Sequence, residues 1–256
     1  IDNFLDIIAA SVLSATAKDG IYIYEVNGTM DVDTVTSEEG DVYLKAEGSI
    51  LDSNDNDNAN VISKNITVVA ITGGIGSADN FLDIVATGVL NATAKGNIYI
   101  YEVEGTMDVD VVRSADGNVY LKAQHSIVDS NNTENYNIRG KNITLEAIVG
   151  SIGTISNFLD IMATGILDAI AKDGIFIHET MGTINLGVVT SEEGDVYLRA
   201  PNSILDSNDT DDANIIGKDI TLVTIIGGIG KANNFLDIIA KGILNATAKG
   251  NIYIYE

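Results

Sequence analysis

The sequence has 256 residues, of which 45% are hydrophobic, and it carries a formal net charge of −23. This hydrophobic content is enough to bury a continuous core and excludes a disordered chain. The negative charge argues against binding to nucleic acid or to anionic membrane surfaces, both of which attract basic proteins. Because the chain has no cysteine, its stability is expected to come from packing rather than from disulfide bonds.

One segment of the sequence occurs four times, and its second copy reads NFLDIVATGVLNATAKGNIYIYE. The four copies begin at Asn3, Asn80, Asn157 and Asn234, so each start lies the same distance along the chain from the previous one. Three full repeats therefore cover residues 3–79, 80–156 and 157–233, and a partial repeat covers 234–256. A fixed period without insertions predicts one continuous array over residues 1–256, in which each repeat packs on its neighbours. The start at Ile1, without a signal-like segment, suggests an interior part of a longer chain.

Within one repeat, five segments share the pattern apolar-x-apolar-x, followed by Ala or Glu. They begin at positions 98, 119, 143, 159 and 175, which predicts four coils of unequal length in each repeat, two longer and then two shorter. The alternation of period two predicts strands with one buried face. The residues predicted to point inward are Ile98, Ile100, Val119, Leu121, Ile143, Leu145, Leu159 and Ile161.

Equivalent strands that recur at these short intervals predict an all-β fold, a parallel β-solenoid (right-handed β-helix) built of 77-residue super-repeats with about four coils each. The glycine-rich segment 73–76 recurs at 150–153 and 227–230 and is expected to form a corner of the coil. A tandem array of sandwich domains explains the period but not the similar strands inside each repeat. A propeller blade of about 40–50 residues does not divide the period naturally.

The segments GDVYLKAEGSI (40–50) and KNITVVAITGGIG (64–76) resemble the filamentous-haemagglutinin-type repeats of large secreted bacterial exoproteins. The resemblance extends over the whole chain. It implies a right-handed parallel β-helix, export by two-partner secretion, and a role as a long adhesive or contact-dependent shaft. The amino-terminal secretion domain of such proteins is absent from this sequence.

Each repeat contains one acidic segment, at residues 52–58, 129–135 and 206–212. Alternating oxygen-bearing side chains along a loop suit a hard cation such as Ca²⁺, although the pattern lacks the central Gly and final Glu of an EF-hand. The candidate calcium ligands are Asp52, Asn54, Asn56, Asp129, Asn131, Asp206, Asn208 and Asp212. The alternative is that these residues form surface turns by bonding to their own backbone.

Seven Asn-x-Thr sequons could carry sugar if the source glycosylates secreted proteins. They lie at Asn27, Asn65, Asn91, Asn131, Asn142, Asn208 and Asn245. The alternative is that Asn and Thr suit the turns and outward positions of a solenoid.

Outward-facing tyrosines recur on the predicted strands and are candidates for lateral contacts between fibres, because tyrosine combines apolar area with a polar tip. The residues proposed for this role are Tyr22, Tyr24, Tyr99, Tyr101, Tyr253 and Tyr255. The alternative is simple cross-strand stacking along one sheet.

The sequence gives little support for catalysis. His125 and His178 occupy non-equivalent positions of the repeat, aligned with Gly48 and Tyr101. No zinc-binding spacing or phosphate-binding glycine motif is present. The glutamate pairs at 38–39 and 192–193 are expected to be solvated turn charges. We therefore expect a protein that is not an enzyme and needs no cofactor, with calcium as the exception to test.

The predicted function is a structural shaft segment of a long fibre or adhesin, secreted or at the cell surface. The alternative is a repeated binding module that holds calcium, glycan or neighbouring fibres through its acidic loops and tyrosine bands. The expected partners are further copies of the chain, joined end to end or laterally, and cell-surface glycans. Nucleic acid and membrane insertion are not expected.

Overall fold

A computed structural model describes residues 3–54, 56–131, 133, 135–208 and 210–256. The chain divides into two compact units, residues 1–124 and 125–256, and each is treated by itself. Over the described ranges, the regular structure consists of strands alone. Those ranges contain no helix with the length and hydropathy needed to cross a membrane.

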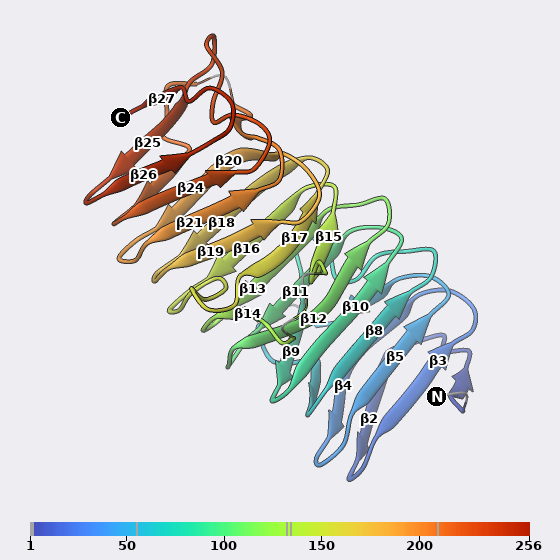
Figure 1. Ribbon diagram of the computed structural model, residues 1–256. Helices are drawn as coiled ribbons and strands as arrows, with labels where there is room; N and C mark the ends of the chain where they lie inside the picture. Colours follow the sequence, from blue (N-terminus) through green and yellow to red (C-terminus); the bar gives the residue numbers. More distant parts are fainter. Residues whose placement is uncertain (1–2, 55, 132, 134, 209) are drawn as a thin grey trace. The chain divides into compact units, whose positions relative to one another are not determined.

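The first unit has two parallel sheets, joined by a chain that passes back and forth between them (Figure 1). In order of pairing, the first sheet contains β1 (Leu5–Ile7), β3 (Ile21–Glu25), β5 (Val42–Ala46), β8 (Ile66–Ala70), β10 (Val89–Ala94) and β12 (Met107–Ser114). The second sheet contains β2 (Leu13–Ala17), β4 (Met30–Ser37), β7 (Val61–Ser63), β9 (Leu82–Ala86), β11 (Ile98–Glu102) and β13 (Val119–Ala123), with β6 (Ile50–Asp52) also paired to β4.

The second unit repeats this arrangement and begins with β14 (Ile127–Asp129). Its first sheet contains β15 (Ile138–Gly140), β17 (Leu159–Ala163), β19 (Ile175–Glu179), β21 (Val196–Ala200), β24 (Ile220–Thr224) and β26 (Leu244–Thr247). Its second sheet contains β16 (Ile143–Ala147), β18 (Ile166–Ala171), β20 (Ile184–Ser191), β23 (Ile215–Gly217), β25 (Leu236–Ala240) and β27 (Ile254–Tyr255), with β22 (Ile204–Asp206) also paired to β20.

Each turn of the chain contributes strands to both sheets, so each unit is a β-solenoid. The chain makes about 12 turns of about 21 residues each. The prediction of an all-β parallel solenoid is therefore confirmed. Parallel strands cannot be joined by tight hairpins and need a long crossover connection. Here the chain makes this crossover by passing through the opposite sheet before it returns.

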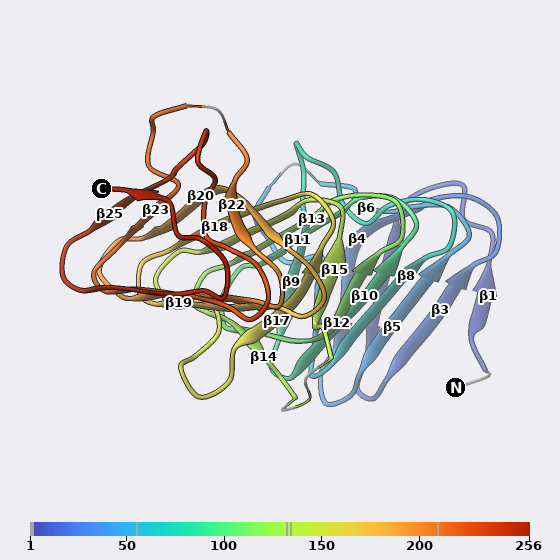
Figure 2. The ribbon, with the colours of Figure 1, turned by 45° about the horizontal axis from the view of Figure 1, so that its top comes forward.

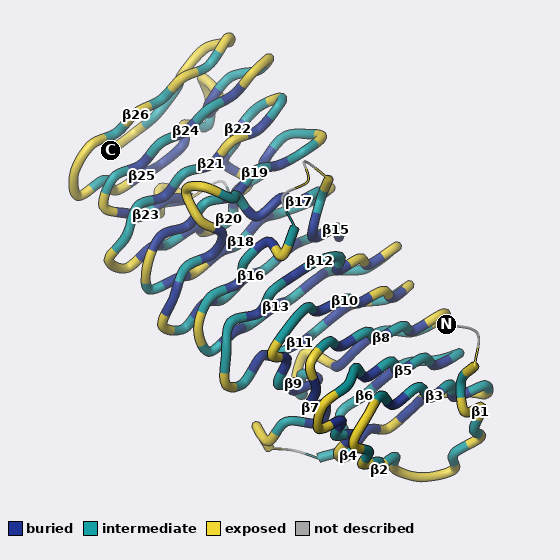
Figure 3. Tube along the Cα trace, turned by 60° about the horizontal axis from the view of Figure 1, so that its bottom comes forward, coloured by how far each residue is buried: buried dark blue, intermediate teal, exposed yellow. Residues whose placement is uncertain are grey.

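The core lies between the two sheets of each unit and follows the alternation of the sequence. Figure 3 shows buried and less buried positions alternating along the strands, with the most exposed residues in the connections. All eight residues predicted to point inward are at most 1% exposed. Burying one Leu or Ile side chain stabilises the fold by roughly 1.5–3 kcal/mol, so this ladder is the main source of stability.

The coil boundaries differ from those predicted. In the first repeat, the equivalent segments begin at positions 21, 42, 66, 82 and 98. The first three form β3, β5 and β8 of one sheet, whereas the last two form β9 and β11 of the opposite sheet. The short coil predicted from 66 to 82 is therefore only part of a turn. The register pairs Leu82 with Ile100, so the next turn runs between these two residues rather than from 82 to 98.

Consecutive copies of the repeated segment consequently lie in opposite sheets. Its first copy supplies β1 to the first sheet and its second copy supplies β9 to the second sheet. The same exchange occurs in the second unit between β17 and β25. One repeat therefore corresponds to about three and a half turns, and within each unit consecutive repeats place the same feature on opposite sheets.

The glycine-rich corners are confirmed. Ile75 points into the core and bridges Ile50 to Ile98 in the adjacent turns. Gly76 has a φ of 61°, a left-handed conformation that glycine adopts without the steric cost of a side chain. A Cβ there would also overlap the carbonyl oxygen of Tyr99. The corner therefore needs glycine for both its backbone conformation and its close packing.

Candidate functional site

The three acidic loops follow β6, β14 and β22 and lead into β7, β15 and β23. Figure 2 shows the third of them, drawn in orange, extending away from the coil between β22 and β23. Four residues of these loops, Asp55, Asn132, Glu134 and Asp209, lie outside the described residues. The candidate ligands named above are all described.

Many of the predicted ligands form local turns, as the alternative interpretation expected. The backbone N–H of Asn54 donates to Asp52 Oδ1 at 2.8 Å, and that of Asn58 donates to Asn56 Oδ1 at 2.9 Å. Asn56 and Asp212 are exposed on the loops. The first aspartate is different in the second and third loops, because Asp129 and Asp206 are only 8% and 5% exposed, whereas Asp52 is partly exposed.

A fully buried asparagine closes the base of each loop. Asn60 Nδ2 donates to Asp52 Oδ1 at 2.6 Å, and Asn60 Oδ1 accepts the backbone N–H of Asp83 at 2.9 Å. The backbone N–H of Asn60 donates to the carbonyl oxygen of Asp83 at 2.8 Å. The same bonds recur at Asn137 and Asn214. One amide thus joins the start of the loop to the strand in the next turn.

The second aspartate of this arrangement lies in the repeated segment, at Asp83, Asp160 and Asp237, and is 3%, 5% and 9% exposed. We call each set of two aspartates and one asparagine an acidic node. The first node is Asp52, Asn60 and Asp83; the second is Asp129, Asn137 and Asp160; the third is Asp206, Asn214 and Asp237. The sequence analysis did not select the second aspartate or the asparagine.

The first and third nodes place negative charges near one another. Burial raises the pKa of Asp83 to about 7, and the negative charges of Asp52 and Asp57 add to the shift, while Lys122 opposes it. Burial likewise raises the pKa of Asp237, and Asp206 and Asp211 add to that shift. In each node the Oδ2 atom of the first aspartate is buried without a hydrogen-bond partner. Such orphaned oxygens are rare in native proteins and call for an explanation.

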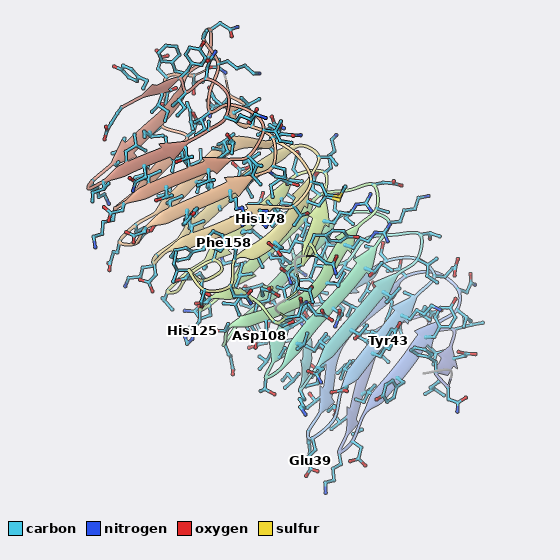
Figure 4. The ribbon with its side chains drawn as sticks, viewed as in Figure 1. Glu39, Tyr43, Asp108, His125, Phe158 and His178 are labelled. Carbon is cyan, nitrogen blue, oxygen red and sulfur yellow. The ribbon has the colours of Figure 1, made fainter. Side chains whose placement is uncertain are left out.

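The second node contains a histidine where the equivalent position of the first holds a tyrosine. His178 pairs in register with Asp160, as Tyr101 does with Asp83. His178 Nδ1 lies 2.9 Å from Asp160 Oδ1. Both residues line a cavity of about 210 Å³ together with Phe158 and Arg199, and Figure 4 shows His178 beside Phe158. The other histidine, His125, is exposed.

The described part of the chain brings no three His, Cys, Asp or Glu side chains together at metal-ligand spacing. A cation at a node would therefore need amide and backbone oxygens beside the two carboxylates. Calcium accepts such mixed oxygen ligands readily, whereas zinc favours a compact tetrahedron of nitrogen and sulfur.

The sequons fall into different environments. Asn27 and Asn245 are exposed. Asn65 instead joins neighbouring turns, since its Nδ2 donates to Asp41 Oδ1 at 2.8 Å and its Oδ1 accepts the N–H of Val89 at 2.9 Å. Asn142 accepts the N–H of Ile166 in the same way. Asn91, Asn131 and Asn208 are partly exposed.

The tyrosines point outward, as predicted, and contact neighbours within their own sheet. Tyr99 stacks on Tyr120 with ring centroids 4.6 Å apart and an interplanar angle of 8°. The Tyr24 hydroxyl donates to Glu47 at 3.1 Å, and Lys45 Nζ lies 4.4 Å from its ring centroid. Tyr22, Tyr101 and Tyr253 are partly exposed, and Tyr255 is exposed. Cross-strand stacking thus engages several of these rings and leaves their edges accessible.

A glutamate at the end of one strand in each repeat has a structural role that was not predicted from the sequence. Glu25, Glu102 and Glu179 occupy inward positions at strand ends and are at most 1% exposed. Glu102 accepts the N–H groups of Ala86 at 2.8 Å and Gly105 at 3.2 Å. The carboxylate therefore joins the turn after its own strand to the strand of the preceding turn. The sequence signal was the Glu that replaces Ala at the end of the strand pattern.

The paired glutamates are turn charges, as predicted. Glu38 and Glu39 are exposed, and Glu39 Oε1 lies 3.4 Å from Lys18 Nζ at the surface (Figure 4). Exposed pairs of this kind contribute little to stability.

Comparison with known proteins gives no family for this chain: no family model matches it, and neither a curated protein nor a solved structure shows significant similarity.

Proposed function

We propose that the chain is a structural segment of a long extracellular or cell-surface fibre, the shaft of an adhesin of the filamentous-haemagglutinin type. Its role is to extend the length of a stiff scaffold by adding turns. One observation carries this proposal: the same buried side chains recur in each repeat at the same spacing. The acidic nodes, the inward glutamates and the corner glycines all follow this rule.

This recurrence suits a mechanical role because every repeat contributes the same packing. A site evolved for one reaction would place a single set of residues at one point of the array. Here the buried polar residues join adjacent turns, through Asn60 and Glu102 in the first unit and Asn214 in the second. Stability of such arrays is approximately a sum over repeats and their interfaces.

The proposal predicts that length grows linearly with the number of repeats. Parallel strands lie about 4.8 Å apart, so a repeat of about three and a half turns should add roughly 17 Å. The measurement is small-angle scattering and electron microscopy of the chain and of variants with one or two further copies of residues 80–156. A maximum dimension that grows by this increment supports the shaft. A dimension that grows only as the cube root of mass would exclude it.

A matched control separates length from composition. A variant in which the inserted repeat carries the same amino acids in scrambled order adds the same mass and charge without the strand alternation. We expect it to broaden the scattering profile without the defined increment. Equal behaviour of the ordered and scrambled insertions would contradict the proposal.

A further inference from the structure

We propose that the first and third acidic nodes each bind one hard divalent cation of the calcium class, and that in the second node a histidine side chain occupies one of the carboxylate oxygens that the cation needs. This site differs from the one expected along the exposed loop. It lies at the base of the loop, where the first loop aspartate faces the repeated segment in the next turn.

The first argument is the orphaned carboxylate oxygen. Asp206 uses Oδ1 twice, accepting from the N–H of Asn208 and from Asn214 Nδ2, both at 2.8 Å. Its Oδ2 is buried and has no partner, although the residue is only 5% exposed. Burying an anionic oxygen without a partner is strongly unfavourable. A bound cation would remove this cost.

A second carboxylate supports the same location from another strand. Asp237 lies in β25 and is 9% exposed. Its backbone N–H donates to Asn214 Oδ1 at 3.1 Å, and Nδ2 of the same asparagine donates to Asp206 Oδ1. A third carboxylate, Asp211 on the loop, lines one cavity together with Asp237. The first node has the equivalent residues in Asp52, Asp83 and Asp57, two repeats earlier in the sequence.

The available ligands indicate the class of cation. The first node adds a buried amide oxygen, Asn54 Oδ1, that also lacks a hydrogen-bond partner. In the first node, two carboxylates and this amide therefore offer a cation oxygen ligands only. Calcium takes six to eight such ligands at variable geometry, whereas magnesium demands a near-ideal octahedron and keeps more of its water.

The second node has the same orphaned oxygen, Asp129 Oδ2, but its second carboxylate is already bonded to a side chain. His178 Nδ1 holds Asp160 Oδ1 at 2.9 Å, and Arg199 lines the same cavity. The equivalent positions of the first repeat are Tyr101 and Lys122. An imidazole bonded to Asp160 occupies a carboxylate oxygen that a cation would need. Because Lys122 and Arg199 are both positively charged, the histidine is the difference between the two nodes. The second node is therefore expected to bind calcium much more weakly.

The experiment is calorimetric titration of the intact chain with calcium chloride near pH 7.5, after removal of metal with a chelator. We expect about two calcium ions per chain, with dissociation constants within the roughly 10⁻⁴–10⁻³ M range of extracellular calcium modules. Thermal unfolding with and without calcium gives a second readout, because a ligand that binds only the folded state raises the melting temperature.

Matched variants assign the ions to nodes. Asp52→Asn and Asp206→Asn keep the Oδ1 acceptor that the loop uses, so the fold is retained while the orphaned anionic oxygen is lost. Each should reduce the stoichiometry by about one. Asp129→Asn makes the same change in the second node and should leave the stoichiometry unchanged. The double variant His178→Tyr with Arg199→Lys restores the residues of the first repeat and should add a calcium ion.

Several results would overturn the proposal. Absence of both heat and a melting-temperature shift at about 5 mM calcium, above the weakest affinity expected, excludes the sites. If calcium binding is unchanged in Asp52→Asn and Asp206→Asn, the calcium sites lie elsewhere on the acidic surface and the proposal is wrong. An equal loss from Asp129→Asn, or no gain from the double variant, refutes the role assigned to His178. Because the shaft proposal is tested by length, its failure is distinguishable from a failure here.

Discussion

Replacing Gly153 by alanine is expected to lower the free energy of unfolding by about 3 kcal/mol or more. Gly153 has a φ of 65°, a left-handed conformation that costs a residue with a side chain about 1–2 kcal/mol. A Cβ at this position would also overlap the carbonyl oxygen of Phe176 and lie 2.8 Å from the N–H nitrogen of Leu159. Both atoms belong to backbone that holds adjacent turns together, so neither can move freely.

The control for this prediction is Gly182→Ala in the same unit. A Cβ at Gly182 would find its nearest neighbour, Glu179 Oε1, at 3.8 Å, and its backbone is not left-handed. We expect a change within about 0.5 kcal/mol. The measurement is thermal and urea unfolding followed by circular dichroism. Equal unfolding midpoints for the two variants would show that the corner does not require glycine.

The stability of the protein is expected to fall as the pH rises from about 4.5 to about 7, and Glu102 is a named source of this dependence. Burial raises the pKa of Glu102 from 4.5 to about 7, although the N–H groups of Ala86, Glu104 and Gly105 act in the opposite direction. A carboxyl whose pKa is raised on folding stabilises the folded state fully below its unfolded pKa. That contribution is lost as the pH rises through the folded value.

The size of this effect follows from the shift. A change of one pKa unit corresponds to about 1.4 kcal/mol, so Glu102 could contribute up to about 3 kcal/mol between pH 4.5 and pH 7. Burial also raises the pKa of Glu179, at the equivalent position of the next repeat, and this acts in the same direction. Reduced self-repulsion at lower pH adds a further contribution of the same sign, because the chain carries a net charge of −23 at pH 7.

A pair of variants isolates the contribution of Glu102. Glu102→Gln keeps an oxygen acceptor in place but cannot ionise, so the unfolding midpoint should depend less on pH. Glu38→Gln removes one carboxylate from an exposed turn and should leave the pH dependence almost unchanged. Urea midpoints at pH 5, 6, 7 and 8 provide the comparison. Identical profiles for both variants would show that Glu102 does not titrate as expected.

The local pattern of the fold could be predicted from the amino-acid sequence. The alternation through Ile98, Ile100, Val119 and Leu121 identified the inward side chains, because a strand places neighbouring residues on opposite faces. The corner at Gly76 was also predicted, since a recurrent glycine marks a place where a side chain does not fit. Even the outward tyrosines followed from the same period. These features depend on residues close together in the chain.

Which strands share a sheet follows from contacts between turns and could not be predicted from the pattern along the chain. The segments beginning at positions 66 and 82 look like successive coils, yet β8 and β9 lie in opposite sheets. The intervening strands of the opposite sheet, such as β4 and β12, carry a different pattern and were not recognised as parts of the same turns. Pairing is set by the register between turns, which a pattern along one strand does not contain.

The acidic nodes show the same limit at the level of a site. The loop beginning at Asp52 was selected as acidic, but its partner Asp83 is distant in sequence and sits at an outward position of an alternating strand. Its burial at 3% exposure comes from its surroundings in the folded chain, where Asp52 and Asp57 are near enough to act on its charge. The strands and turns could therefore be predicted from the sequence. The buried pairs of carboxylates form only when the turns stack, because contacts between turns join residues that are far apart in the chain.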